Sequence, residues 1–191
     1  TYRVLDIADL TVDGSLCTGG AVCIMLMLSG QNVWVALAGA FLAGMVSGFA
    51  TGLLHTFMGI PAILSGILTQ LGLYSINLKI MGKANQAINV DKFDLLVSLR
   101  FIKNVPFYKN TILLVAIIIA LLIVFLYWFF GTELGCSLRA TGCNDKMARA
   151  QGINTDLSRV LGLMISNGLV ALSGALLAQY QGFADVNMGR G

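Results

Sequence analysis

The sequence predicts an all-α membrane protein, a polytopic bundle of transmembrane helices that forms a single domain over residues 1–191. Hydrophobic residues make up 57% of the chain and charged residues only 11%, whereas soluble domains carry roughly 25% charged residues. No Asp, Glu, Lys or Arg occurs between Gly14 and Leu78 or between Thr111 and Gly131. Uncharged apolar runs of this length are typical of membrane spans, each of which needs about 20 residues.

Five spans are predicted from the apolar runs, and the first of them is short, glycine-rich and broken. They cover Gly14–Ser29, Val33–Phe57, Ile60–Ile80, Thr111–Phe130 and Leu157–Tyr180. The fourth span ends in the aromatic run YWFF, whose rings suit the headgroup level of a bilayer. This span has no stripe of small residues, so we expect it to face lipid.

Small residues at a spacing of four mark the second span as an interior helix. Ala40, Gly44, Gly48 and Gly52 fall on one helix face. Small side chains at this spacing let two helix backbones approach closely. The fifth span is also rich in Gly and Ser around Asn167. We therefore expect both spans to pack inside the bundle, with a role in lining a solute path as the alternative.

Two polar segments flank the fourth span, and they are expected on opposite sides of the membrane. Residues 79–110 contain six Lys or Arg, and residues 131–159 contain four. A count of positive charges alone places 79–110 in the cytoplasm. The net charge of +3 is small, and the basic residues gather between spans as in most bilayer proteins, so no nucleic-acid partner is predicted.

The polar segment before the fifth span contains the signals of a short helix held outside the bilayer. Asn144 or Asp145 can cap a helix over 146–151, because a side-chain oxygen at that position accepts an unpaired backbone N–H. Gly152 suits the left-handed position that ends such a helix. One of the polar residues at 154–156 then caps the fifth span. A short exposed helix between two spans is suited to docking on a partner.

The motif Leu138-Arg139-Ala140-x-Gly142-x-Asn144-x-x-x-Ala148-Arg149-x-x-Gly152-Ile153 resembles the cytoplasmic coupling loop of ABC importer permeases. The branch concerned carries ribose-type sugars and branched-chain amino acids. The resemblance implies that residues 131–156 lie in the cytoplasm and dock into a cleft of a separate ATPase. It places the loop 79–110 outside the cytoplasm, whereas the count of positive charges places it inside. We adopt the extracytoplasmic placement, because the loop also holds two acidic residues that weaken the count.

The resemblance also implies roles for single residues of this coupling loop. Arg139 and Arg149 would pair with acidic residues of the ATPase. Gly142 and Asn144 would shape the turn. Ala148 and Gly152 would allow close approach to the ATPase. The alternative is an ordinary polar loop that anchors two helices.

Two further stretches extend the likeness over nearly the whole chain. Asp9-Leu10-Thr11-Val12-Asp13-Gly14-Ser15 is similar to the DLSVGS-like element of the same permeases, with an extra Asp13. Residues 166–182 resemble an uncharacterised branch, some of whose members are associated with uptake of aromatic amino acids. The resemblance implies a multi-pass subunit in the bacterial inner membrane, importing an amino acid or a sugar. It would form a homodimer with two ATPase subunits and an extracytoplasmic substrate-binding protein.

Residues 9–15 are predicted to lie near the translocation path. We expect Gly14 to interrupt the first span, and irregular backbone at membrane depth is tolerated only where it is buried in protein or lines a cavity. Asp9 and Asp13 would be costly in lipid. Together with Ser15 and Asn167, these residues are the candidates for the path. The alternative for both Asp residues is a role as helix caps in the aqueous interface.

No enzyme chemistry is predicted. The chain has no GxxxxGK[ST] phosphate loop, so ATP is expected on a partner subunit and no cofactor on this chain. His55 is the only histidine, and the four cysteines lack metal-ligand spacing, so neither a metal site nor catalytic residues are expected. An ion-coupled secondary transporter and a non-transporting assembly subunit are the alternative functions. The sequence begins without an initiator Met and closes on Met188-Gly-Arg-Gly without a helix end, so we expect a fragment truncated at both ends.

Overall fold

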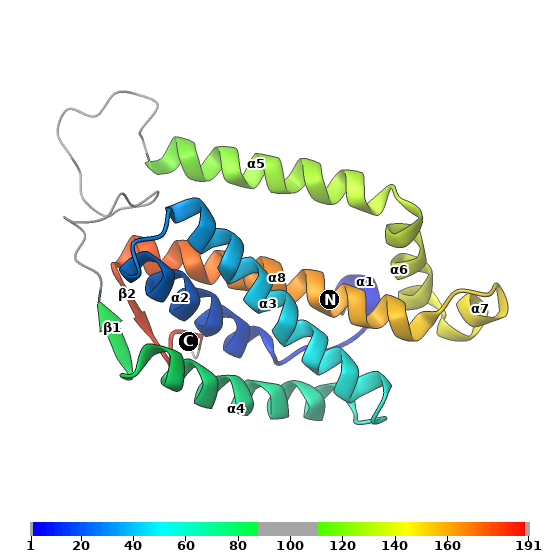
Figure 1. Cartoon of the computed structure of the whole chain (residues 1–191). Helices are drawn as coiled ribbons and strands as arrows, with labels where there is room; N and C mark the ends of the chain where they lie inside the picture. The colour runs from blue at the N-terminus through cyan, green and yellow to red at the C-terminus, as the bar shows by residue number, and fades with distance from the viewer. Residues whose placement is uncertain (1, 88–110, 190–191) are drawn as a thin grey trace.

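The computed structural model describes residues 2–87 and 111–189, which form a bundle of helices with one small pair of strands (Figure 1). The predicted all-α fold class is confirmed. In chain order the elements are α1 Tyr2–Leu5, α2 Val12–Leu28, α3 Val33–Thr56, α4 Ala62–Met81, β1 Asn85–Ala87, α5 Thr111–Phe130, α6 Glu133–Cys143, α7 Asp145–Ala150, α8 Thr155–Gln181 and β2 Phe183–Asp185.

The centre of the bundle is the interface between α3 and α8, with α2 packed against both. Glycines of α3 lie directly on the α8 backbone. A Cβ atom added at Gly48 would come 2.3 Å from the carbonyl oxygen of Leu163, and one at Gly44 would come 2.5 Å from that of Asn167. Ala40 continues the same face and is fully buried. The stripe at spacing four therefore lets two helices touch through their backbones.

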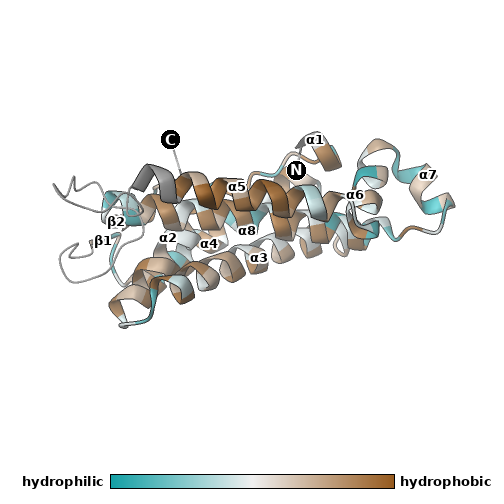
Figure 2. Ribbon diagram, turned by 90° about the horizontal axis from the view of Figure 1, so that it is seen from above, coloured by the Kyte–Doolittle hydropathy of each residue, from teal (hydrophilic) through white to brown (hydrophobic). Residues whose placement is uncertain are grey.

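Among the described residues, three helices are long and apolar enough to cross a membrane, namely α3, α4 and α8. The apolar part of α5 together with α6 forms a fourth candidate, bent by 77° at the junction, and α2 is a shorter apolar helix. Large apolar side chains stay exposed on these helices, for example Leu42 at 60% and Val46 at 66%. The ribbons of the helices are mostly brown in Figure 2, and the exposed apolar side chains suit surfaces that contact acyl chains.

The predicted break at Gly14 is wrong. Helix α2 runs through this residue, and the irregular backbone lies earlier, between α1 and α2, where Asp6 has a φ of 54°. Ser15 N donates to the Thr11 carbonyl at 2.9 Å, so the first turn of α2 closes normally. Gly14 instead lets α4 pack closely against α2, because a Cβ atom added at this residue would lie only 3.3 Å from Cα of Gln70.

The strands β1 and β2 were not predicted. They pair antiparallel, with Gln86 opposite Ala184, at the end of the bundle away from α7 (Figure 1). Of the predicted loop 79–110, the structure describes the last turn of α4 and β1, and residues 88–110 lie outside the described residues.

Candidate functional site

The first candidate site is the segment α6–α7, which projects beyond the end of the bundle (Figure 1). Its local geometry follows the predicted signals. Asn144 caps α7, since its Oδ1 accepts from Met147 N at 3.1 Å. Gly152 has a φ of 83°, in the left-handed region, and Asn154 caps α8 by accepting from Leu157 N at 3.2 Å. The predicted helix caps and the predicted left-handed glycine at the end of α7 are confirmed.

Ion pairs fold α7 back onto the start of α8. Arg149 Nη2 lies 2.9 Å from Asp156 Oδ1, and Arg149 Nε donates to Thr155 Oγ1 at 2.7 Å. Arg159 Nη2 lies 3.2 Å from Asp145 Oδ2. Half-exposed pairs of this kind contribute little stability, about 0–1 kcal/mol each. Their effect is to orient the segment, and Arg149 therefore already has acidic partners within its own chain.

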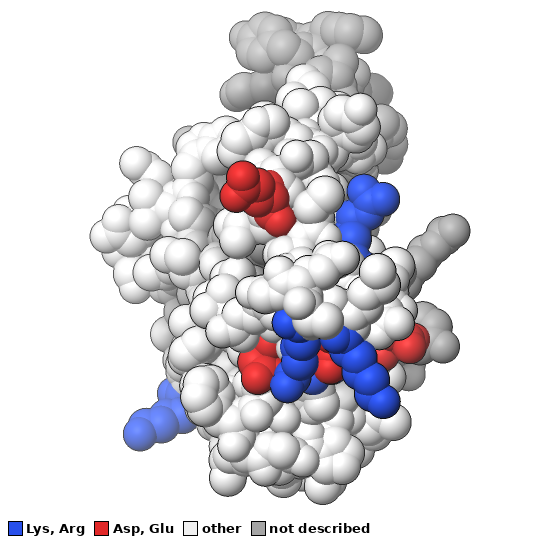
Figure 3. Space-filling model, turned by 90° about the vertical axis from the view of Figure 1, so that its right-hand side faces the viewer, with Lys and Arg blue, Asp and Glu red and all other residues white. Residues whose placement is uncertain are grey.

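The outer surface of α7 carries mixed charge around an apolar tip. Lys146 and Arg149 are exposed, and Met147 is exposed at 60%. Figure 3 views the molecule from this end and shows basic and acidic side chains interspersed on it. Arg139 on α6 is exposed as well. This end presents a charged, protruding surface on which Met147 is an exposed apolar side chain.

Two of the predicted coupling residues have structural positions that the sequence did not indicate. Gly142 lies within α6, not in a turn, so that part of the interpretation is wrong. A Cβ at Gly142 would collide with the Val4 carbonyl, and the glycine thus allows α1 to cross α6. Ala148 is 2% exposed and packs inside the segment. Gly152 is open, with nothing within 4 Å of an added Cβ.

A hollow of about 580 Å³ lies at the base of this segment. It is bounded by the irregular chain after α1, the corner between α3 and α4, and the junction of α6 with α7. The charged side chains at its wall are Asp6, Asp145 and Arg159, and His55 also lines it. Oδ1 of Asp145 is buried without a hydrogen-bond partner. Within the described residues no group of His, Cys, Asp and Glu is arranged to hold a metal ion.

The second candidate site is a layer of polar side chains between α2, α3 and α8. It brings together three of the five predicted path residues. Asn167 Nδ2 donates to Asp9 Oδ2 at 2.7 Å, and Asn167 Oδ1 accepts from Ser15 Oγ at 2.6 Å. Ser15 also shares a 2.8 Å hydrogen bond with Ser47, and Thr11 shares one of the same length with Thr51.

The polar groups of this layer satisfy one another. Asp9 Oδ1 additionally accepts from Thr11 N at 2.9 Å, and Asn167 is fully buried. Polar side chains that hydrogen-bond to one another across helices stabilise the association of those helices in a membrane bundle. Sequence reasoning missed Ser47 and Thr51, although each directly precedes a glycine of the α3 stripe. Their spacing of four was the signal that could have revealed them.

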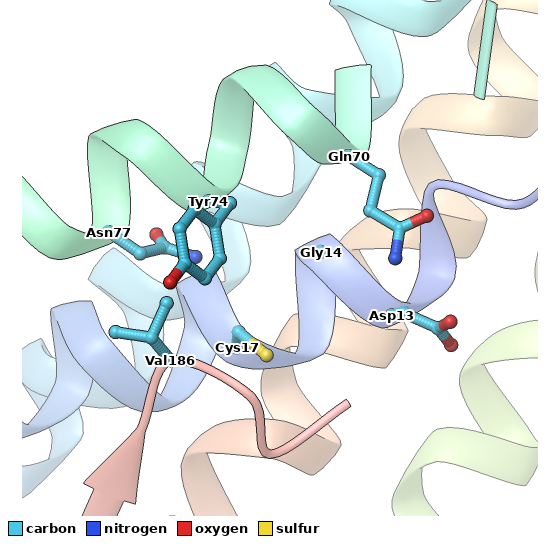
Figure 4. A pocket seen from close by; sticks show the side chains of 7 residues that line it. All are labelled: Asp13, Gly14, Cys17, Gln70, Tyr74, Asn77 and Val186. Atoms are coloured by element: carbon cyan, nitrogen blue, oxygen red, sulfur yellow. The ribbon is translucent and has the colours of Figure 1, made fainter. Parts of the chain in front are cut away.

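Asp13 and Gly14 lie apart from this layer, in a pocket between α2, α4 and the end of the chain (Figure 4). The other lining residues are Cys17, Gln70, Tyr74, Asn77 and Val186. Asn77 is 1% exposed, and neither its Oδ1 nor its Nδ2 has a hydrogen-bond partner. Sequence reasoning gave Gln70 and Asn77 no role, although a spacing of seven places them on one face of α4.

A family model for the permease component of branched-chain amino acid transport systems matches the chain over residues 1–191. The chain belongs to this permease family. Its helices are those of a multi-pass protein of the bacterial inner membrane, as expected for a member of a family of transport permeases. No solved structure gives a significant match.

Several curated relatives match essentially the whole chain. It is 41% identical to the tyrosine transport system permease protein of Clostridioides difficile, covering all of this chain and 61% of that protein. It is 39% identical to the uncharacterised protein RP368 of Rickettsia prowazekii, covering 65% of that protein. It is 31% identical to the autoinducer 2 import permease LsrC of Yersinia pestis, covering 99% of this chain and 51% of LsrC. The chain thus spans about half to two thirds of these relatives.

Proposed function

We propose that the chain belongs to the membrane-spanning subunit of an ATP-binding-cassette importer for a small polar solute, an amino acid or a sugar. The observation that carries this proposal is the α6–α7 segment. It is a short capped helix that projects from the bundle, held by ion pairs of Arg149 and Arg159 and presenting charge at its tip. Family membership supports the same reading.

The segment is suited to transmit a movement to the helices on both sides of it, α5 and α8. Helix α6 joins α5 directly, and α7 is tied to the start of α8 by Arg149. A push on α7 would therefore reach the α3–α8 interface, where backbones touch and little deformation is tolerated. In this mechanism ATP-driven closure of a cytoplasmic ATPase moves α6 and α7. The spans then switch which side of the membrane the solute path opens to.

The remaining parts of the importer are assigned to partners. The sequence has no phosphate loop, so ATP would bind the separate ATPase. A homodimer of the full-length protein and an extracytoplasmic substrate-binding protein complete the assembly. Among solutes, the relative named as a tyrosine transport permease favours an amino acid. Asp9, Asp13, Gly14, Ser15 and Asn167 remain the candidates near the translocation path.

The test uses the full-length protein purified with its associated subunits in mild detergent. Mass spectrometry should find an ATPase that carries a phosphate loop. Arg149→Glu should lower solute uptake at least tenfold relative to ATP hydrolysis, because it reverses charge on α7. Lys83→Glu is the matched control, since Lys83 is exposed at the opposite end of the bundle. Absence of any ATPase would contradict the proposal and favour an ion-coupled transporter.

A further inference from the structure

A recess with one cationic side chain lies where α5 meets α6. It has a volume of about 400 Å³ and is lined by Val4, Phe130, Arg139 and Cys143. This volume falls in the range of about 300–1,000 Å³ that is typical of small-ligand sites. Among the described lining residues, Arg139 alone is charged. The recess therefore combines a guanidinium with largely apolar walls.

Arg139 differs from Arg149 and Arg159 in its surroundings. Those two arginines pair with aspartates of this chain. Within the described residues, Arg139 has neither an ion pair nor a hydrogen bond. A guanidinium has five N–H donors in a fixed fork and binds phosphate through two parallel hydrogen bonds. Arg139 is thus available to an anion that this part of the chain does not supply.

The bend between α5 and α6 keeps Arg139 at the level of the bilayer surface. The two helices meet at 77°, and α6 turns away from the axis of α5 (Figure 1). Arg139 lies about 9 Å along α6, at 1.5 Å per residue, so it is displaced sideways from α5 rather than away from the membrane. Tyr127 and Trp128, in the last turn of α5, are largely exposed, and such rings gather at the headgroup level. The guanidinium therefore lies at the depth of the lipid phosphates.

A mostly apolar stripe continues from the recess along α5. Its members follow one another at spacings of three and four and so share one helix face, namely Phe130, Tyr127, Ile123 and Ile119. The last three of these side chains are exposed. The stripe is about 16 Å long at 1.5 Å per residue, which is close to half of the roughly 30 Å apolar core of a bilayer. An acyl chain of one leaflet is therefore a suitable occupant.

We propose that the recess binds an anionic phospholipid of the cytoplasmic leaflet, with its phosphate on Arg139 and one acyl chain along Phe130 and the α5 stripe. A carboxylate of a partner protein would also pair with Arg139, but it would leave the stripe uncovered. Basic pockets on the cytoplasmic side of membrane bundles are suited to anionic lipid headgroups. The site goes beyond the importer function, and only the choice of leaflet rests on that proposal.

The first test measures lipid retention. The full-length permease is released from nanodiscs that hold equal amounts of phosphatidylcholine and phosphatidylglycerol, and native mass spectrometry identifies the lipids that stay bound. Phosphatidylglycerol should be retained in preference to phosphatidylcholine. Arg139→Gln should lower its retention at least fivefold, about the factor that one basic residue adds at an anionic surface. Arg139→Lys should lower it less, because Lys keeps the charge without the bidentate geometry. Lys146→Gln is the matched control, since Lys146 is exposed in the same projecting segment but does not line the recess, and retention should change less than twofold.

Cys143 gives a second readout, because it lines the recess and its thiol is exposed. Variants that keep Cys143 or Cys136 as the single cysteine are labelled with an uncharged maleimide. Replacing pure phosphatidylcholine by the mixture with phosphatidylglycerol should slow labelling of Cys143 at least threefold. Cys136 is the matched control, since it is exposed on the same helix and is not among the lining residues, and its labelling should not respond. Inorganic phosphate added to nanodiscs of pure phosphatidylcholine should not protect Cys143.

Several results would overturn the lipid site. They are equal retention by Arg139→Gln and the unmodified permease, equal slowing of labelling at Cys136 and Cys143, and protection of Cys143 by inorganic phosphate alone. Release of a bound ATPase by Arg139→Gln, with lipid retention unchanged, would overturn it as well and assign Arg139 to the ATPase contact. Absence of any ATPase from the preparation would overturn the importer and not the lipid site, because retention of phosphatidylglycerol is measured on the permease itself.

Discussion

Replacing Gly48 by Ala tests whether α3 and α8 are held together by backbone contact. The new Cβ would lie 2.3 Å from the Leu163 carbonyl oxygen and 2.8 Å from the Met164 Cα. Both atoms belong to the α8 backbone and cannot rotate away as a side chain would. The two helices must therefore separate at this point.

The size of the effect follows from that separation. An ordinary contact begins at 3.4 Å, so the helices must move apart by about 1 Å. A gap of that size forfeits about a quarter to a half of each dispersion contact along the interface. Overpacking of a close-packed interior costs about 1–3 kcal/mol, and we expect Gly48→Ala at the upper end of this range because the obstacle is backbone.

Two other glycines provide the graded controls. Gly52→Ala should cost less, because two of its three nearest neighbours, at 3.1 and 3.2 Å, are side-chain atoms of Val160. Gly72→Ala should cost nothing, because nothing lies within 4 Å of its Cβ and Ala favours a helix over Gly by about 1 kcal/mol.

The assay is thermal unfolding of the purified full-length permease in one detergent, followed by loss of helical circular dichroism. The expected order of Tm is Gly72→Ala at or above the unmodified protein, then Gly52→Ala, then Gly48→Ala. A Gly48→Ala protein that unfolds at the same temperature as the unmodified protein would refute the backbone-contact interpretation.

Three further predictions concern the polar layer and the projecting segment. Asn167→Ala should destabilise the protein by about 2–4 kcal/mol in the same unfolding assay, because it removes the side-chain donor to Asp9 Oδ2 and the amide oxygen that accepts from Ser15; an unchanged Tm would argue against the layer. Asn144→Ala should speed hydrogen exchange in α7, since it removes a cap that contributes about 1 kcal/mol, and equal exchange would contradict this. Gly152→Val should increase tryptic cleavage after Arg149, whereas Gly152→Asn should not, because Asn tolerates the left-handed backbone; equal cleavage of the two would count against strain at that position.

The apolar runs and the local caps could be read directly from the sequence. A helix follows from some 20 uncharged apolar residues wherever they sit in a bilayer. Caps are also local, since Asn144 and Asn154 each bond a backbone N–H three residues away. The left-handed Gly152 belongs to the same class, because only the conformational freedom of glycine is involved.

The segregation of the polar residues was decided by the tertiary structure alone. Asp9 and Asp13 are four residues apart, yet one joins Asn167 across 158 positions of sequence and the other lines a pocket together with Gln70 and Asn77. Which side a residue faces depends on the rotation and register of each helix against its neighbours, and a helix that is apolar on all sides carries no pattern that fixes either. For the same reason the sequence could not place Gly142 against α1 or pair β1 with β2. Local bonding fixed the helices and their ends, and packing between distant segments fixed the sites.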